Sequence, residues 1–384
     1  MATPEGWKEP RRTSTSRWRS FLSRGRNKSQ EPGPAEEPRE PSRPRTASPP
    51  PPQQRRGLPP QRQQPPAQSQ PNVYGSPARS AAPQAPQAAP AAQRAVAPTP
   101  TLTPPRDPRG GGQADPAVLN ALRRPMGRSR VIAFINPKGG VHKTTATVLT
   151  AAALGSARSA GGAQQSGVIA WDDNELRGTL GLRAGSARHG RTIRHLVEHL
   201  DRVEAAGVQL PEHLDEFLRH SADGSFDVLA GDEDPKLQLK LDPTTVLRML
   251  DILTRTHELV CIDTGNNVES HNWRTVVSSA DRLVVTTVPR EDAAFSADWM
   301  LDLLEENGYG HLVKDAVTLL SLPTPNPGPL LQDLSAHFSS RTKDVAVVPY
   351  DPALEPGAKI EFSALRDQTR NAWYEAAAKI IDGY

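Results

Sequence analysis

The chain has 384 residues and a formal net charge of +3, but 27 of its 39 prolines fall in residues 1–130. That part carries 22 of the 46 Lys and Arg residues and 8 of the 43 Asp and Glu residues, so its net charge is +14, against −11 for the rest. The acidic part is a poor candidate for non-specific DNA binding, whereas the basic part suits DNA, an anionic membrane surface or its own acidic neighbour. A single fold therefore does not cover the chain.

The one cysteine, Cys261, lies in the apolar run 259–262, which excludes an internal disulfide and a multi-cysteine metal site. We expect a buried, inert thiol there. No stretch approaches the ~20 apolar residues of a membrane span, and no signal-peptide core follows the basic N-terminus. These features predict a cytoplasmic protein, either free or peripheral at the membrane or nucleoid.

Residues 1–125 are predicted to be a disordered, basic, proline-rich tail. From 28 to 118 the composition is dominated by Pro, Gln, Ala, Arg and Ser, which cannot offset the entropy of ordering by burial. A semi-extended linker is the simplest reading. Within the tail, Trp18, Phe21 and Leu22 stand among arginines, a pattern also typical of short segments that dock on a surface or a partner.

Residues 126–384 are predicted to form one folded domain. Apolar runs of strand length alternate there with helical patterns, at 131–135, 168–171, 259–262, 283–288, 317–320 and 345–348. Strands that are apolar on both faces and alternate with helices indicate a mostly parallel sheet covered on both sides. The predicted fold class is therefore α/β, a doubly wound sheet.

A glycine-rich loop, 137–145, connects the first of these strands to the helical pattern 146–154. Strand, glycine loop and helix are the context of a phosphate-binding P-loop. Glycines let backbone N–H groups approach phosphate oxygens, a lysine supplies charge to the β- and γ-phosphates, and a threonine hydroxyl can bind Mg²⁺. The predicted nucleotide-binding residues of this loop are Gly139, Gly140, Val141, His142, Lys143, Thr144 and Thr145.

With Lys138 directly before the paired glycines, the loop resembles that of the ParA/MinD group of deviant Walker A ATPases. The resemblance implies ATP and Mg²⁺ as cofactors and an ATP-dependent homodimer, in which Lys138 contacts the phosphates bound to the partner subunit and serves catalysis. His142 stands where relatives usually have glycine. Because histidine enters left-handed conformations more readily than most residues, we expect it to be accommodated there without a catalytic role.

The segment 172–181 follows the second strand, where the family carries its switch I aspartates. By resemblance, Asp172 takes the first acidic position, as a catalytic residue and Mg²⁺ ligand, and Asn174 takes the second, which orients the attacking water. An amide is a weaker base than a carboxylate, so slow hydrolysis is expected. Asp173 replaces Asn174 if the loop shifts by one residue.

Asp263 ends the apolar run 259–262, as a Walker B carboxylate does, and joins Thr144 and Asp172 as an expected Mg²⁺ ligand. Asn266 and Asn267 are either switch polar groups or turn formers. Near the C-terminus, Pro349 and Asp351 resemble the family's segment beside the adenine. The asparagine that many relatives place after the preceding strand is absent from 319–323, so a preference for adenine rests on analogy.

Several outputs are compatible with these patterns. An iron–sulfur reductase is disfavoured because its cluster requires more cysteines, and no substrate motif marks a metabolic ligase. Positioning or partitioning of a cargo on DNA or membrane and regulation of a secretion apparatus both remain, each with an unidentified protein partner. A proline-rich tail before such a domain resembles the EspI-like proteins of type VII secretion systems. A nucleotide-gated scaffold with little turnover is the alternative.

Overall fold

The computed structural model describes residues 114–160, 166–174, 178–185, 190–232 and 241–384. The expected tail, including its aromatic patch, lies almost wholly outside these residues. Within them no helix is long and apolar enough to cross a lipid bilayer.

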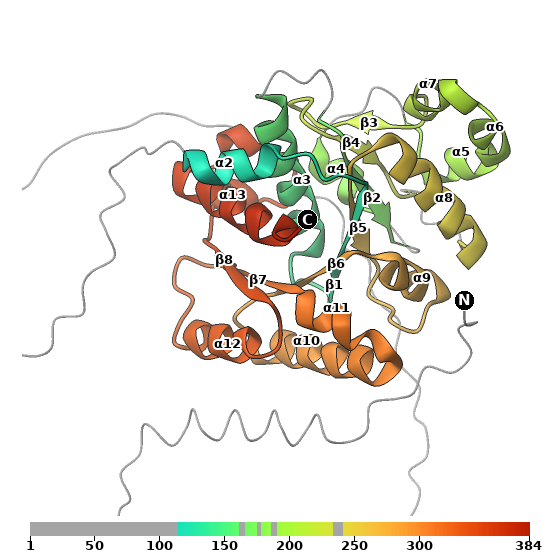
Figure 1. Cartoon of the computed structure of the whole chain (residues 1–384). Helices are drawn as coiled ribbons and strands as arrows, with labels where there is room; N and C mark the ends of the chain where they lie inside the picture. The colour runs from blue at the N-terminus through green and yellow to red at the C-terminus, as the bar shows by residue number, and fades with distance from the viewer. Residues whose placement is uncertain (1–113, 161–165, 175–177, 186–189, 233–240) are drawn as a thin grey trace, which may run out of the picture. The chain divides into compact units, whose positions relative to one another are not determined.

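The described strands form one sheet (Figure 1). They are β1 (Arg130–Ile135), β2 (Val168–Asp173), β3 (Arg219–His220), β4 (Asp227–Leu229), β5 (Leu259–Thr264), β6 (Arg282–Thr287), β7 (Val317–Ser321) and β8 (Asp344–Val348). Their order is β3-β4-β2-β5-β1-β6-β7-β8, and every neighbouring pair is parallel except β3 and β4. The six predicted strands are confirmed. The sequence missed β3 and β4, which are too short to show an apolar pattern.

Helices cover both faces of the sheet. One face carries α2 (Pro116–Arg123), α3 (Lys143–Ser159), α4 (Leu180–Ala184) and α13 (Asp367–Ile381). The other carries α5 (Ile193–Glu198), α6 (Leu200–Glu204), α7 (Leu210–Asp215), α8 (Pro243–Thr256), α9 (His271–Ser279), α10 (Glu291–Leu304), α11 (Gly310–Asp315) and α12 (Leu330–Ser339). Short turns are η1 (Gly207–Gln209), η2 (Glu305–Tyr309), η3 (Pro352–Leu354) and η4 (Phe362–Ala364). The predicted doubly wound α/β class is confirmed.

The central strand β1 shows why its sequence is apolar without alternation. Val131, Ala133 and Ile135 pack into the core on one face, and Ile132 and Phe134 into the core on the other. A strand buried on both faces needs apolar side chains at every position. Because β1 lies between β5 and β6, the loop that follows it emerges at the middle of the sheet's carboxyl edge, where ligands of open α/β sheets bind.

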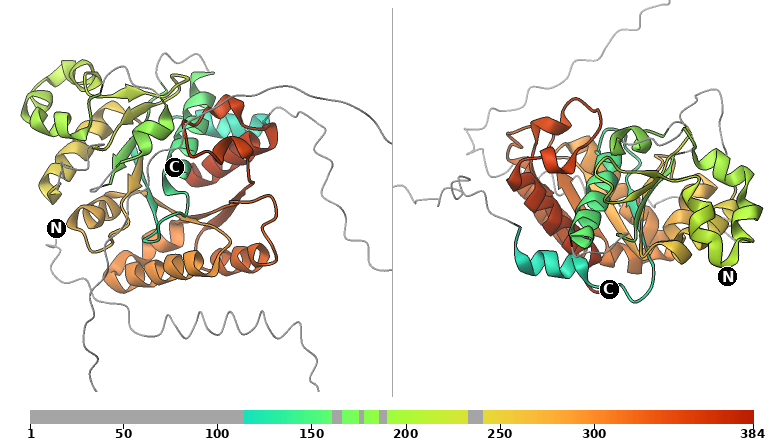
Figure 2. Two further views of the ribbon diagram at one scale, coloured as in Figure 1. Left: turned by 180° about the vertical axis from the view of Figure 1, so that it is seen from behind. Right: turned by 90° about the horizontal axis from the view of Figure 1, so that it is seen from above.

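The folded part begins ahead of the boundary expected at residue 126, because α2 packs on α3 and α13 (Figure 2). Leu122 is fully buried, and the Arg123 Nε donates to the carbonyl of Ala157 at 2.8 Å. Asp115 caps the helix by accepting from the N–H of Ala117, and Pro116 occupies its first turn. These are ordinary helix start signals, which the surrounding proline-rich composition obscured.

Cys261 is fully buried in β5, and burial raises the pKa of its thiol to about 12. The expected burial is confirmed, and a thiol that stays protonated is expected to be unreactive.

Candidate nucleotide-binding site

The loop between β1 and α3 turns tightly through two left-handed residues. Gly140 has φ +74°, and His142, directly before the helix, has φ +64°. His142 is the only non-glycine residue with positive φ in the described chain, so the expected left-handed conformation is confirmed. The turn brings the first residues of α3 to the carboxyl edge of the sheet, where the unpaired N–H groups of a helix N-terminus favour an anion.

Two residues hold this loop in place. Asn136 donates from Nδ2 to the carbonyl of Thr286, at the end of β6, and accepts through Oδ1 from the N–H of Lys138, both at 2.8 Å. Val141 is buried against Val288 and Ala293, which lead into and begin α10. These contacts tie the loop to the end of β6 and the start of α10. The sequence analysis did not single out Asn136, because its contact with Thr286 joins positions 150 residues apart in the chain.

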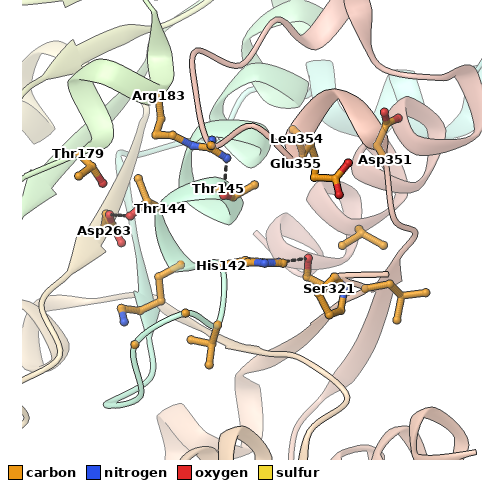
Figure 3. A pocket seen from close by; sticks show the side chains of 18 of the residues that line it. His142, Thr144, Thr145, Thr179, Arg183, Asp263, Ser321, Asp351, Leu354 and Glu355 are labelled. Atoms are coloured by element: carbon orange, nitrogen blue, oxygen red, sulfur yellow. Dashed lines mark hydrogen bonds between the residues drawn. The ribbon is translucent and has the colours of Figure 1, made fainter. Parts of the chain in front are cut away.

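Lys143, Thr144 and Asp263 line one end of a cavity, here named the polar end. Figure 3 shows Thr144 and Asp263 there. The Lys143 Nζ donates to the carbonyl of Asn136 at 2.9 Å and to the side chain of Asn266. Thr144 donates from Oγ1 to Asp263 Oδ2 at 2.5 Å. Burial lowers the pKa of Lys143 and raises that of Asp263, since each charge is costly away from water. Of the two asparagines considered, Asn266 contacts the P-loop lysine.

One carboxylate oxygen at the polar end, Oδ1 of Asp263, can accept a cation. Asp263 Oδ1 is buried and accepts no hydrogen bond from the residues that the structure describes. A buried carboxylate oxygen without a partner is unfavourable unless a cation or water satisfies it. The Thr144 hydroxyl beside it is a second hard oxygen donor, so this pair fits Mg²⁺. In the described chain no group of three or more His, Cys, Asp or Glu side chains forms a metal site, so the remaining ligands would come from phosphate and water.

The cavity has a volume of about 540 Å³, within the range of small-molecule sites. Away from Lys143 its wall becomes apolar, and this second end is here named the apolar end. It is formed by Leu322, Pro323, Pro349 and Leu354. Pro349, which the sequence analysis expected beside the adenine, thus lines the cavity. Asp351 also lines the cavity, but its carboxylate accepts from the N–H groups of Ala353 and Arg366, both at 3.0 Å, and so caps η3.

His142 projects from the loop toward β7 (Figure 3). Its Nδ1 lies 2.9 Å from Oγ of Ser321, at the end of that strand. Burial, and to a lesser extent the charge of Arg183, lower the pKa of His142, so the imidazole is neutral at pH 7. Both residues depart from the ParA/MinD pattern, His142 replacing a glycine and Ser321 lying in the segment that lacks an asparagine. The two departures contact each other.

The three switch I candidates lie in different surroundings. Asp172 is opposite Asp263 in the register of β2 and β5, but its carboxylate accepts from the N–H groups of Leu180 and Asn174 and does not line the cavity. Asp173 is buried and accepts from Nδ2 of Asn272, in α9, at 2.7 Å. Asn174 alone of the three lines the cavity.

Lys138 points away from its own cavity. Its Nζ lies 3.2 Å from Asp292, at the start of α10, and both side chains are about half exposed. Arg290 contacts the same carboxylate and, together with Lys138, holds the pKa of Asp292 below its usual range. An exposed ion pair of this kind stabilises a protein by about 1 kcal/mol or less, so Lys138 can leave Asp292 for a more highly charged anion.

The sequence analysis missed Arg183, the other cation in the cavity wall. It lies in α4, is 8% exposed, and donates from Nη2 to the Thr145 hydroxyl and from Nη1 to the carbonyl of Ala358, both at 2.9 Å. No motif marks this arginine, because the fold alone brings α4 to the P-loop.

No protein-family model matches the chain. Among curated proteins, the chain is 28% identical over 267 residues to the ESX-1 secretion-associated protein EspI of Mycobacterium tuberculosis, in two strains. The chain resembles EspI. The alignment covers 68% of this chain and 38% of EspI, so the chain spans well under half the length of these relatives.

Solved structures similar to this one include the cell division ATPase MinD of Pyrococcus furiosus and a ParA family ATPase of Chlorobium tepidum. The first is 20% identical with a TM-score of 0.48, and the match covers 66% of this chain and 98% of that one. The second is 16% identical with a TM-score of 0.45, covering 66% and 96%. MinD of Pyrococcus horikoshii, solved with Mg-ADP, is 18% identical with a TM-score of 0.48, covering 65% and 94%. The resemblance to the ParA/MinD group and to EspI, predicted from the sequence, is confirmed.

Proposed function

We propose that the cavity binds ATP with Mg²⁺. The observation that carries the proposal is the convergence of Lys143, Thr144 and the unsatisfied oxygen of Asp263 beside the N-terminus of α3. Backbone N–H groups and a lysine suit phosphates, and the two oxygen donors would suit a divalent cation. When bound, Mg²⁺ neutralises charge on the β- and γ-phosphates. The apolar end, with Pro349 and Leu354, would receive the adenine.

Slow hydrolysis follows from the side chain that lines the cavity at the switch. Asn174 can hold a water by hydrogen bonds, but it cannot take up a proton as a carboxylate does. Asp172 supports this arrangement from the neighbouring strand, where its hydrogen bonds with the N–H groups of Asn174 and Leu180 fix the start of the switch segment. A Mg²⁺ contact of Asp172 would run through water.

The active form is an ATP-dependent homodimer. Lys138 does not line its own cavity, and among the described residues its ammonium pairs only with the exposed Asp292, so it is available to the phosphates bound by a second copy. Phosphate offers more negative charge than one solvated carboxylate, which favours the transfer. If two copies associate only when ATP is bound, nucleotide binding controls whether the protein is a monomer or a dimer.

The cellular role of the protein is proposed from its similarity to EspI. EspI is, by its name, a secretion-associated protein, which favours regulation of a secretion apparatus over the positioning or partitioning of a cargo. An unidentified protein partner is implied in either case, and we place the chain in the cytoplasm, free or peripheral at membrane or nucleoid. Asn174 favours one further candidate, a nucleotide-gated scaffold with little turnover. Measurement of phosphate release from the full chain distinguishes a slowly hydrolysing ATPase from a scaffold with little turnover.

The basic tail is proposed to carry any contact with DNA or anionic lipid, since residues 1–130 hold net +14 and the rest −11. Deletion of residues 1–113, which leaves α2 in place, is expected to remove that binding. The binding of the full chain should weaken steeply with salt, because it rests on counterion release. Equal binding by the truncated chain at the same ionic strength would make the tail a linker only.

Substitution Lys143→Ala tests the nucleotide site. Since a charged hydrogen bond to phosphate is worth roughly 2–3 kcal/mol, we expect the affinity for Mg·ATP to fall by ~30-fold or more in equilibrium titration. The exposed Lys314, on α11, provides the matched control Lys314→Ala, which should bind as the parent does. Undiminished affinity in a folded Lys143→Ala variant would refute the P-loop assignment.

A further inference from the structure

Arg183 is a buried cation that pairs with no carboxylate of the described residues. Its side chain is 8% exposed, and among the described residues no acidic oxygen lies within 4 Å of the guanidinium. Its contacts are neutral groups, the hydroxyl of Thr145 and the carbonyl of Ala358. A charge held away from water is unfavourable unless an opposite charge compensates it. Arginine does not lose its proton in proteins, so neutralisation is not an alternative.

The place of Arg183 in the cavity indicates what that opposite charge is. Thr145 lies one residue beyond Thr144 in the first turn of α3, and the segment around Ala358 follows η3 at the apolar end. Figure 3 shows Arg183 above Thr145, between Thr144 and Asp263 on one side and Leu354 on the other. The guanidinium therefore faces the middle of the cavity, between the polar end and the apolar end.

We propose that Arg183 binds the α-phosphate of the nucleotide. This inference rests on the proposed function, in which the β- and γ-phosphates lie at Lys143 and the base at the apolar end. The α-phosphate of a bound nucleotide then lies between those ends, beside the first turn of α3. Guanidinium N–H groups have the fork geometry that phosphate oxygens accept. Two N–H groups already fixed by Thr145 and Ala358 keep this fork oriented before the ligand arrives.

A purely structural role predicts something different. Arg183 links α4 to the segment after η3, since its Nη1 donates to Ala358 and its own carbonyl accepts from the N–H of Ile360 at 2.7 Å. If that link were its whole role, loss of the side chain would loosen the apolar end and weaken nucleoside binding itself. An α-phosphate contact instead weakens only ligands that carry a phosphate.

The experiment compares full-length Arg183→Met and Arg183→Lys with Lys359→Met. Lys359 lies in the same segment but pairs with Glu361 at 2.8 Å and does not line the cavity, so its loss removes a nearby positive charge without touching the site. Dissociation constants for ATP, ADP, AMP and adenosine are measured by competition against a fluorescent ATP analogue. Thermal unfolding without nucleotide reports on the fold of each variant.

In Arg183→Met, affinities for ATP, ADP and AMP should fall by a common factor of roughly 10 to 100, with adenosine unchanged. AMP is the decisive ligand, because it lacks the phosphates that Lys143 contacts. Arg183→Lys retains the charge and is expected to disturb the fold less, so its affinities for the three nucleotides should fall by a smaller factor. Lys359→Met should bind all four ligands as the parent does. Unchanged AMP affinity in either Arg183 variant, or an equal loss for adenosine, would overturn the inference. If the parent binds none of the three nucleotides, the proposed function itself fails.

Discussion

The polar end and the apolar end of the cavity are assembled in different ways. At the polar end Lys143 and Thr144 are neighbours in sequence, and Asp263 reaches them from the adjacent strand β5. At the apolar end Leu322 and Leu354 come from loops after β7 and β8 and are brought together only by the sheet. The polar end has the lysine, threonine and aspartate that the sequence motifs predict, whereas the contact of His142 with Ser321, beside the apolar end, joins two positions that depart from the ParA/MinD pattern. Sequence motifs therefore mark the polar end more directly than the apolar end.

Lys138→Ala has the largest expected effect. The Lys138 side chain does not line its own cavity, and its proposed contact is with the phosphates bound by a second copy of the chain. We expect the variant to bind Mg·ATP with near-parental affinity yet to sediment as a monomer under conditions where the parent forms a dimer. Asp292→Ala is the matched variant, since it removes the contact of Lys138 within its own chain. That variant should dimerise at least as readily as the parent. Equal dimerisation of Lys138→Ala and the parent would refute the transfer of Lys138 between subunits.

How far the sequence predicted this site depends on how local each contact is. Lys143, Thr144 and Asp263 were predicted because each is tied to the end of an apolar strand, and parallel strands end at one edge. Arg183 and Asn136 were not, because their contacts with Thr145 and Thr286 join positions 38 and 150 residues apart in the chain. Asp351 was predicted to lie beside the adenine, but in the structure its carboxylate caps η3. Residues of this kind are recognised only from the folded structure.

Asn174→Asp tests the switch side of the polar end with a smaller expected effect. A carboxylate at this position can accept a proton from the attacking water, so ATP hydrolysis should accelerate, by about 100-fold if general-base catalysis is restored in full. Phosphate release under single-turnover conditions measures the change. Asp173→Asn is the control, because Asp173 accepts a hydrogen bond from Asn272 and does not line the cavity. No acceleration by Asn174→Asp, combined with inactivation by Asp173→Asn, would move the role to Asp173.

The smallest expected effect concerns the pair His142 and Ser321, which links the loop to β7 next to the apolar end. If the two departures from the family pattern compensate each other, their side chains should be energetically coupled by about 1 kcal/mol, the usual net value of a hydrogen bond. A double-mutant cycle of His142→Ala and Ser321→Ala, read from urea unfolding without nucleotide, measures this coupling.

His142→Gly separates the hydrogen bond from the backbone strain. Glycine adopts φ +64° at no steric cost, so this variant loses the contact with Ser321 but relieves the left-handed conformation that alanine would retain. We therefore expect His142→Gly to unfold at a higher urea concentration than His142→Ala. Ser321→Ala should destabilise the parent chain and leave the His142→Gly chain unchanged. If Ser321→Ala costs the same in both backgrounds, the two side chains are not coupled, and the departures at the two positions are independent of each other.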